Sequence, residues 1–162
     1  SFDGVNDWVT IPDANSLDLT SGMTLEAWVR PSALGSWRTV VFKERPGGNV
    51  YGLYADQGGS RPLGQVFIGS ERSATGTAAL PLNAWTHLAT TFDGAVVRLY
   101  VNGVLAGSAS FAGAMAASTG VLRIGGNSVW GEWFSGLIDE VRVYDRALTA
   151  GEIQQDMQAP IG

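Results

Sequence analysis

Hydrophobic and polar residues alternate with a period of two in many short segments of this chain. Residues 23–30, MTLEAWVR, show the pattern without a break. Met23, Leu25, Ala27 and Val29 occupy one face of an extended segment, and the intervening residues occupy the other. This pattern predicts a strand that turns one face toward a hydrophobic core.

The remaining strand-like segments are short and are separated by turn residues. Asp93-Gly94 and Asn102-Gly103 divide residues 85–110 into three apolar segments, which predicts two consecutive hairpins with tight turns. Further strands are expected where β-branched and aromatic residues lie between Gly, Pro, Ser or Asp: 37–44, 50–56, 64–70, 120–126 and 136–145.

One short helix is predicted from Thr149 to about Met157, because Thr149 and Glu152 have the spacing of a capping box. About eleven short strands without an internal repeat indicate two packed antiparallel sheets. The predicted fold is therefore an all-β sandwich of jelly-roll type with one short C-terminal helix. At 162 residues and 17.1 kDa, residues 1–162 are expected to form a single domain.

Asp139 poses a problem within this scheme. If residues 137–144 form a regular strand, Leu137, Val141 and Val143 lie on one face, and Asp139 falls on that same apolar face. Burial of an ionised carboxylate without a partner is strongly unfavourable. A cation or a set of hydrogen-bond donors is therefore expected to meet Asp139.

Composition excludes several classes of function. The net charge is −5, the pI is near 4.7 and no basic cluster is present, so the surface that would neutralise nucleic-acid phosphates is missing. The absence of cysteine excludes thiolate metal sites and cysteine nucleophiles. No apolar run approaches the length needed to span a membrane. The abrupt start at SFDG and the loose end QAPIG are interpreted as those of a module from a longer exported protein.

Several stretches resemble the laminin-G-like, concanavalin A-like jelly-roll domains, in the same order and over essentially the whole chain. They are FDGVNDWVTIP, MTLEAWVRP, WTHLATTFDGAVVRLYVNGVLAG and GLIDEVRVYDRALTAGEI. The resemblance implies a domain found outside cells or at cell surfaces, often attached to glycosidases, adhesins or other modular exported proteins. Many members bind calcium and some bind sugar, so the resemblance specifies the fold more closely than the function.

The resemblance also implies a role for Asp139. Members of the family commonly bring the N-terminal Phe-Asp-Gly segment beside the final strand, with a calcium ion between them. Asp3 and Asp139 would then face one another, and Ca²⁺ would balance both charges. Asn6 and Asp7 are either additional ligands or turn-forming residues. The alternative is that Asp139 is half-exposed and that Asp3 caps a turn without a metal.

A catalytic centre is not expected. The Glu-x-Asp-x-Glu-like pattern of related jelly-roll glucanases is absent. Glu26 and Glu140 could approach each other, but Arg30 and Arg142 lie beside them, which favours cross-strand charge pairs on a structural surface that covers an aromatic side chain. His87, the one histidine, is expected to be packed and hydrogen-bonded. The chain is therefore predicted not to be an enzyme.

The tryptophans suggest a ligand-binding surface. Trp8, Trp28 and Trp85 are expected in the core, whereas Trp37, Trp130 and Trp133 lie next to turns or in the glycine-bounded segment GNSVWGEWFSG. Exposed aromatic rings could stack on sugar rings. Side chains that could then bond sugar hydroxyls are Arg38, Asn127, Ser128 and Glu132, and Tyr51 and Tyr54 could contribute from an open sheet face. The alternative is that VWGEWF folds inward as a lid over the core.

Two functions remain open from the sequence. The first is a calcium-stabilised, extracellular, monomeric module that binds carbohydrate and is attached to an exported enzyme or adhesin. The second is a structural or protein-adhesion domain of a cell-surface protein. The first predicts a solvent-facing cluster of tryptophans and the second predicts buried ones.

Overall fold

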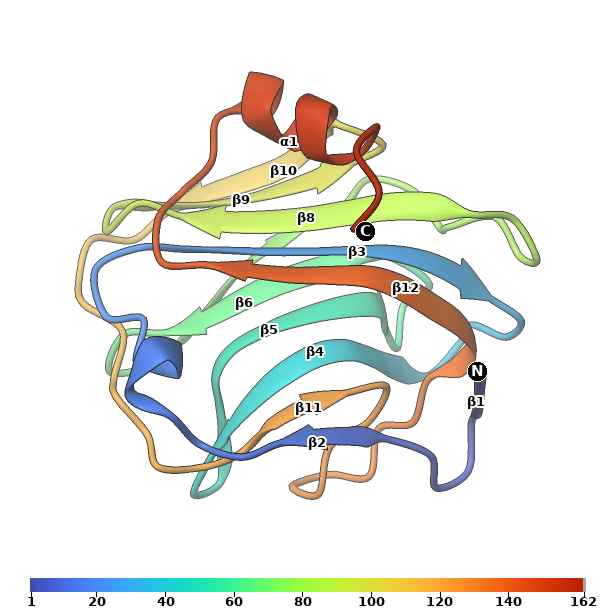
Figure 1. Cartoon of the computed structure of the whole chain (residues 1–162), viewed down its shortest axis with the longest axis horizontal. Coiled ribbons are helices and arrows are strands. Elements are labelled where there is room, and N and C mark those ends of the chain that lie inside the picture. Colours follow the sequence, from blue (N-terminus) through green and yellow to red (C-terminus); the bar gives the residue numbers. More distant parts are fainter. Residues whose placement is uncertain (162) are drawn as a thin grey trace.

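Two six-stranded antiparallel sheets pack face to face and confirm the predicted jelly-roll sandwich (Figure 1). The structure is a computed structural model that describes residues 1–161; Gly162, the last residue of the predicted domain, lies outside them. Sheet A has the order β1 (Phe2–Asp3), β12 (Ser135–Tyr144), β3 (Met23–Pro31), β8 (Thr86–Phe92), β9 (Val96–Val101) and β10 (Val104–Ser110). Sheet B has the order β2 (Val9–Ile11), β11 (Leu122–Ile124), β4 (Trp37–Arg45), β5 (Gly48–Gln57), β6 (Leu63–Phe67) and β7 (Glu71–Thr75).

The hydrophobic core lies between the two sheets. Met23, Leu25, Ala27 and Val29 of β3 are fully buried in it, as their alternation predicts. A short 3₁₀ helix (Asn15–Leu17) and the helix α1 (Ala150–Asp156) lie outside the sheets. In the part of the chain that the structure describes, no helix is long and apolar enough to cross a membrane.

Both predicted hairpins are present in the segment β8–β9–β10, with a two-residue turn at Asn102-Gly103 and a longer one at residues 93–96. Asn102 and Gly103 have φ angles of 50° and 73°, the pair of positive values that suits a two-residue hairpin. Gly94 has a φ of 87°, and the Asp93 carboxylate accepts hydrogen bonds from the backbone N–H groups of Ala95 and Val96. These three strands pair in sequence order, so the predicted meander is present.

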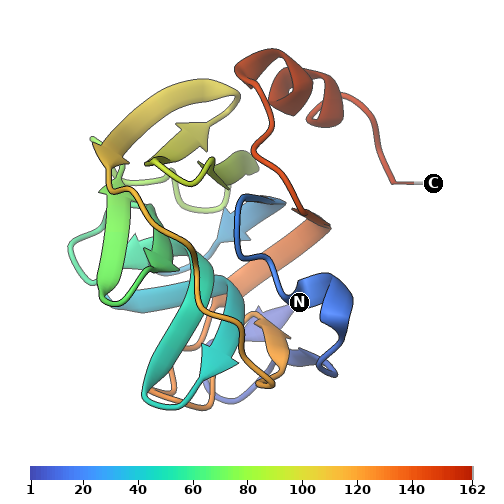
Figure 2. The ribbon, with the colours of Figure 1, turned by 90° about the vertical axis from the view of Figure 1, so that its left-hand side faces the viewer.

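The C-terminal helix begins with the predicted capping box. The Thr149 side chain accepts a hydrogen bond from the Glu152 N–H, and the Glu152 carboxylate accepts one from the Thr149 N–H at 2.8 Å. Ile153 is fully buried and packs with Ala89, Tyr100 and Leu148. Figure 2 shows α1 on the outer side of sheet A, away from sheet B. The helix therefore covers one outer face of the sandwich.

The expectation that Asp139 faces the core is wrong, because β12 contains a β-bulge. Asp139 lies opposite Trp28 and Arg142 lies opposite Glu26, so three steps along β12 match two along β3. The bulge includes Glu140, whose φ is 52°, and it reverses the alternation of the strand. Ile138, not Leu137, packs against the core together with Val141 and Val143. Asp139 is exposed, and its Oδ1 accepts a hydrogen bond from the Glu140 N–H at 2.9 Å.

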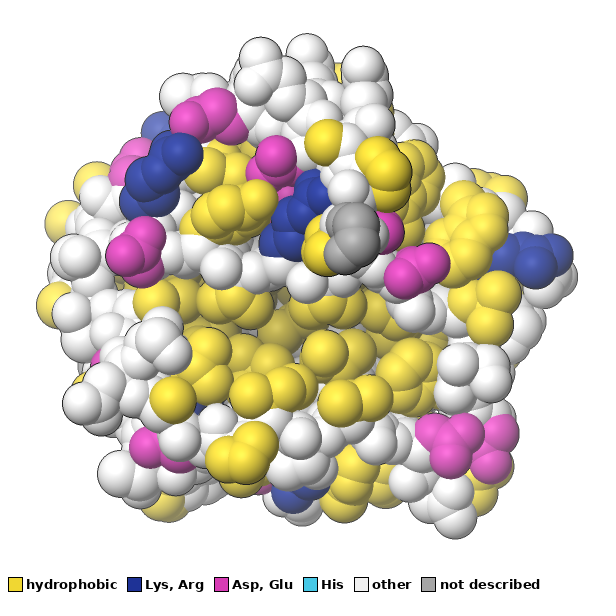
Figure 3. All heavy atoms as spheres, in the orientation of Figure 1, with side chains coloured by type: hydrophobic (Ala, Val, Ile, Leu, Met, Phe, Trp, Pro, Cys, Tyr) yellow, Lys and Arg dark blue, Asp and Glu magenta, His cyan; other side chains and the backbone are white. Residues whose placement is uncertain are grey.

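The sandwich is apolar along the side that lies between β12 and β2. Figure 3 shows a band of hydrophobic side chains in a hollow on this face. Partly buried residues on the elements that border it, which pack against the core, are Phe2, Ile11, Leu17, Ile138, Val141 and Val143. The core is therefore more exposed at this open side of the sandwich than between the central strands of the two sheets.

A polar cluster lies between sheet A and α1, where the sequence predicted a structural surface of paired charges. Glu26 is fully buried, and Arg142 lies 4.0 Å from its Oε2. Arg142 also donates a hydrogen bond of 2.6 Å to the Asp156 carbonyl, and Tyr144 donates one of 2.7 Å to the Asp156 carboxylate. The Glu26–Arg142 pair is thus present, but the helix and the segment after it cover it.

Burial shifts the pKa values of two groups in this cluster, Glu26 on β3 and His87 on β8. Desolvation and then the negative charge of Asp156 raise the pKa of Glu26 from its ordinary value of 4.5 to about 8. Desolvation and then the positive charge of Arg142 lower the pKa of His87 from 6.5 to about 4. His87 is packed as predicted, with Trp28 edge-on at 5.4 Å between ring centroids, but its Nδ1 has no partner among the described residues.

Because of Glu26, the free energy of unfolding should fall as the pH rises from 6.5 to 8. The folded state keeps the Glu26 proton up to about pH 8, whereas the unfolded chain loses it near 4.5, so unfolding becomes easier as the pH rises between these values. His87 acts in the opposite direction, but only between about pH 4 and 6.5. Glu26→Gln should therefore flatten the decline above pH 6.5 in urea unfolding. Glu71→Gln, on the other sheet, should keep it. An equal decline in the wild type and in E26Q would contradict this assignment.

Candidate functional site

A groove of about 360 Å³ lies on the outer face of sheet B. Its lining comes from three strands and from the loop that joins β11 to β12 (residues 125–134), and consists of Trp37, Gln65, Glu71, Trp130 and Glu132. Two other hollows flank the Arg45–Pro46 turn, and their linings contain no aromatic side chain. An aromatic groove with a few polar groups has the character expected of a small-ligand site.

A row of four aromatic rings supports this groove. Successive ring centroids are 5.1 Å apart for Trp37 and Tyr54, 6.3 Å for Tyr54 and Phe42, and 5.7 Å for Phe42 and Trp130, all edge to face. Tyr54 and Phe42 are fully buried, whereas Trp130 is 46% exposed. Because Phe42 meets the indole edge to face, the contact holds the Trp130 ring in place and leaves much of its surface open to a ligand.

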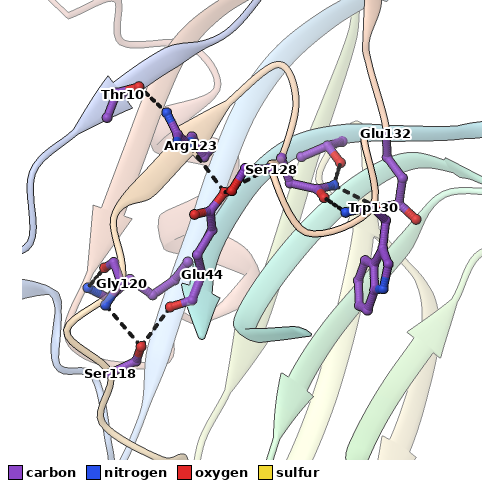
Figure 4. A network of polar contacts seen from close by, with 11 residues as sticks. Thr10, Glu44, Ser118, Gly120, Arg123, Ser128, Trp130 and Glu132 are labelled. Carbon is purple, nitrogen blue, oxygen red and sulfur yellow. Dashed lines mark hydrogen bonds and ion pairs between the residues drawn. The ribbon is translucent and has the colours of Figure 1, made fainter. Parts of the chain in front are cut away.

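Asn127 fixes the β11–β12 loop in the conformation that presents Trp130. Its fully buried side chain donates hydrogen bonds to the Thr39 hydroxyl at 2.9 Å and to the Glu132 carboxylate at 2.8 Å, and accepts one from the Trp130 N–H at 2.8 Å. Figure 4 shows the Trp130 indole and the Glu132 carboxylate extending to the same side of the loop. One amide therefore connects β4 with both groove residues of the loop.

A second set of polar contacts holds the start of the same loop. The Glu44 carboxylate accepts hydrogen bonds from Arg123 Nε at 3.1 Å, from the Ser128 N–H at 2.8 Å and from the Ser128 hydroxyl at 2.9 Å (Figure 4). Burial alone would raise the pKa of Glu44, but the bonds from Ser128 and Arg123 lower it overall. Glu44 therefore stays ionised and secures the loop against the end of β4.

The groove is negatively charged. Burial, with a further contribution from the charge of Glu71, raises the pKa of Glu132, although the hydrogen bonds from Asn127 and Tyr54 partly offset this. Glu71 is half-exposed, and Arg45 Nη2 lies 4.0 Å from its Oε1. Because sugar hydroxyls donate hydrogen bonds to carboxylates, these two side chains are suitable acceptors for a polyhydroxylated ligand.

Of the predicted ligand residues, Trp37, Trp130 and Glu132 line the groove together. Asn127 and Arg38 instead bind the loop: Arg38 donates a hydrogen bond of 2.8 Å to the Trp133 carbonyl. Ser128 likewise bonds Glu44. These residues therefore position the groove rather than line it.

The segment VWGEWF combines both conformations that the sequence left open. Trp130 is exposed at the groove, whereas Phe134 is fully buried in the core. Trp133 is half-buried and packs on Trp8 with a centroid distance of 4.7 Å. The expectation that Trp85 lies in the core is wrong: it precedes β8 and is 44% exposed.

The two tyrosines considered for the binding surface lie on opposite faces of β5. Tyr54 supports the groove from below, whereas Tyr51 is buried in the core and donates a hydrogen bond to the Leu17 carbonyl. Sequence reasoning missed Gln65 and Glu71. Leu63 and Gln65 share the outer face of β6, which the alternation could have shown, but the polar segment ERSAT of β7 carries no apolar signal for a strand.

The structure does not bring Asp3 and Asp139 together. Asp3 lies opposite Ser135 in the ladder and Asp139 lies opposite Trp28, four residues farther along β12. Asp3 Oδ1 accepts hydrogen bonds from the Val5 and Asn6 N–H groups, and Asp7 Oδ2 accepts one from the Asp3 N–H, as in an ordinary turn. Within residues 1–161, no three His, Cys, Asp or Glu side chains are grouped to hold a metal ion. The four predicted ligands, Asp3, Asn6, Asp7 and Asp139, therefore do not fit one shared calcium site.

Comparison with known proteins identifies the family. Residues 3–154 match the family model of the concanavalin A-like lectin/glucanases superfamily, and the chain belongs to this superfamily. It is 30% identical over 156 residues to pappalysin-1 of Mus musculus, an alignment that covers 83% of this chain and 10% of pappalysin-1. The chain thus corresponds to a small part of that relative.

Similar solved structures include domains of larger proteins. Domain 4 of AbnA, an extracellular arabinanase of family GH43 from Geobacillus stearothermophilus, was solved in complex with arabinotriose. It has 26% identity and a TM-score of 0.66, with 93% of this chain and 72% of that chain covered. Domains LG4-5 of the mouse laminin α1 chain have 15% identity and a TM-score of 0.71, with 91% and 43% covered, and show the same fold.

Asn127→Ala should loosen the β11–β12 loop. Removal of the amide leaves the Thr39 hydroxyl and the Glu132 carboxylate without the donor that they share. The free energy of unfolding measured in urea should therefore fall by about 2 kcal/mol. Tryptophan emission should shift to longer wavelength as Trp130 loses its support. Asn15→Ala, at an exposed asparagine, is the control and should change neither quantity. Unchanged stability and emission in N127A would show that Asn127 does not hold the loop.

Calcium binding remains a prediction from the family resemblance and can be tested by chelation. EGTA should lower the melting temperature and added calcium should restore it, because a ligand that binds the folded state stabilises it. Identical melting with EGTA and with calcium would exclude the ion.

Proposed function

We propose that this chain is a non-catalytic carbohydrate-binding module and that its ligand occupies the groove on sheet B. The observation that carries the proposal is the half-exposed indole of Trp130, held rigid beside the acceptor Glu132 at the end of a row of aromatic rings. A flat apolar ring next to hydrogen-bond acceptors is suited to a sugar ring, which has apolar C–H faces and polar edges.

The family supports a binding role. The chain is 26% identical to a domain of an arabinanase that was solved with arabinotriose, and that enzyme is extracellular. We extend both properties to this chain as part of the proposal: an extracellular location and a short oligosaccharide as ligand. The exposure of Trp130 also distinguishes it from a purely structural domain, which would be expected to bury the aromatic residues of the loop.

The proposed module does not cleave its ligand. Hydrolysis of a glycosidic bond requires one carboxyl group as acid and a second as base or nucleophile. Glu132 is committed to a hydrogen bond with Asn127 that holds the loop, so one of the two groove carboxyl groups is not free for either role. A sugar incubated with the protein should therefore be recovered intact by chromatography, and the appearance of shorter products would contradict a purely binding function.

Replacement of the groove tryptophans should remove sugar binding. Trp130→Ala and Trp37→Ala should each weaken binding about tenfold or more, because each removes an aromatic surface from the groove. Trp85→Ala removes a tryptophan of similar exposure outside the groove and is the matched control. Affinities can be measured by calorimetry with arabinotriose and with the ligands found on a glycan array.

Two results would overturn the proposal. One is the absence of binding to any glycan by the folded wild-type protein. The other is equal weakening by W85A and W130A, because the groove would then have no special role.

A further inference from the structure

We infer that the groove on sheet B selects uncharged saccharides and rejects those that carry carboxylate or sulfate groups. This inference rests on the proposed function and specifies the class of ligand that the groove accepts.

The charged groups that line the groove are both acidic. Glu71 comes from β7 and Glu132 from the β11–β12 loop, so carboxylates approach the ligand space from two separate elements. The other lining residues are Trp37, Gln65 and Trp130, so the lining contains no lysine or arginine. An anionic sugar would have to lose water beside two carboxylates without gaining a cationic partner.

Arg45, the arginine beside Glu71, is already engaged elsewhere. Arg45 donates hydrogen bonds of 2.8 and 2.9 Å to the Asn49 and Pro46 carbonyls, and its guanidinium lies 3.6 Å over the centroid of the Phe67 ring. Its approach to Glu71 is long, at 4.0 Å, so it attracts the glutamate only weakly. It is therefore held against protein groups instead of pointing to the ligand space.

Arg38 is likewise unsuited to receive an anion. Its Nη1 donates to the Trp133 carbonyl and its Nε is buried. An anion that took the place of the Trp133 carbonyl at Nη1 would free the β11–β12 loop that this bond helps to fix. Release of the loop would in turn disturb the position of Trp130.

An uncharged sugar can form favourable hydrogen bonds with the same carboxylates that repel an anionic sugar. Hydroxyl groups donate hydrogen bonds to ionised carboxylates, and such charge-assisted bonds are stronger than neutral ones. Glu71 and Glu132 are acceptors on different elements, and the side-chain oxygen of Gln65 already accepts a hydrogen bond of 2.8 Å from the Asn49 side chain. The polar groups of the groove are thus matched to a ligand that supplies several donors and no negative charge.

Matched sugars test the inference directly. Galactobiose and digalacturonate have the same linkage and ring type but differ in charge. Lactose and 3′-sialyllactose differ by the acidic sialic acid unit that only the second carries. At pH 7 and low salt, the wild-type protein should bind the neutral member of a pair at least about tenfold more tightly, because like charges repel in a partly desolvated groove. The difference should shrink as salt is added.

Isosteric variants locate the source of the discrimination. Glu71→Gln and Glu132→Gln each remove one charge and keep the shape, and a glutamine at 132 can still accept the hydrogen bond from Asn127. Each variant should bring the affinities of the two sugars closer, and the double variant should do so most. Asp145→Asn removes the same charge from an exposed site on β12's C-terminal side and should leave the ratio unchanged. It controls for the overall charge of the protein.

The outcomes separate this inference from the function on which it rests. If W130A abolishes binding but neutral and acidic sugars bind the wild type equally, or the acidic one more tightly, the groove binds sugar and the selection by charge is wrong. If discrimination exists but D145N reduces it as much as E71Q, its source is the net charge and the inference again fails. If neither member of any pair binds, the proposed function fails and the inference fails with it.

Discussion

The candidate site depends on the three hydrogen bonds of the buried Asn127 side chain. They join β4, the backbone of Trp130 and the carboxylate of Glu132, so one group fixes both an aromatic and a polar part of the groove. Without them, a glycine-bounded loop would have many conformations, and a ligand would have to select one at a cost in entropy. A loop ordered before binding avoids that cost, which is why an amide that does not line the groove is important for the candidate site.

Most of the fold could be predicted from the sequence, because it depends on local patterns. Strict alternation at Met23–Val29 gave a correct core face, Asn102-Gly103 gave a correct hairpin turn, and the spacing of Thr149 and Glu152 gave the helix. Edge strand β7 was not predicted, since ERSAT is polar except for Ala74, the one residue of this strand in the core cluster. Alternation of apolar residues identifies strands that bury several side chains. It misses a strand that buries few and depends on backbone hydrogen bonds to its neighbour.

The candidate site was predictable in part, and the errors have physical causes. A position after a turn indicated Trp37 and a glycine-bounded loop indicated Trp130, whereas Gln65 and Glu71 become their neighbours only when β6 and β7 are added to sheet B. Asp139 was misplaced because a bulge changes the alternation by one residue without a signal in composition. Period-two reasoning is valid only up to the first bulge in a strand.

The covering of sheet A explains why the groove lies on sheet B. Each sheet has one face in the core and one outer face, and α1 with the residues after it packs over the outer face of sheet A, where Glu26 and His87 are buried. Sheet B has no helix on its outer face in the described residues, and Trp130 of the β11–β12 loop packs on Phe42 at one end of its aromatic row. Large aromatic side chains on an uncovered face are costly in water unless they are packed together or meet a ligand. Phe42 and Tyr54 are packed, which leaves the exposed part of Trp130 as the surface that a ligand would cover.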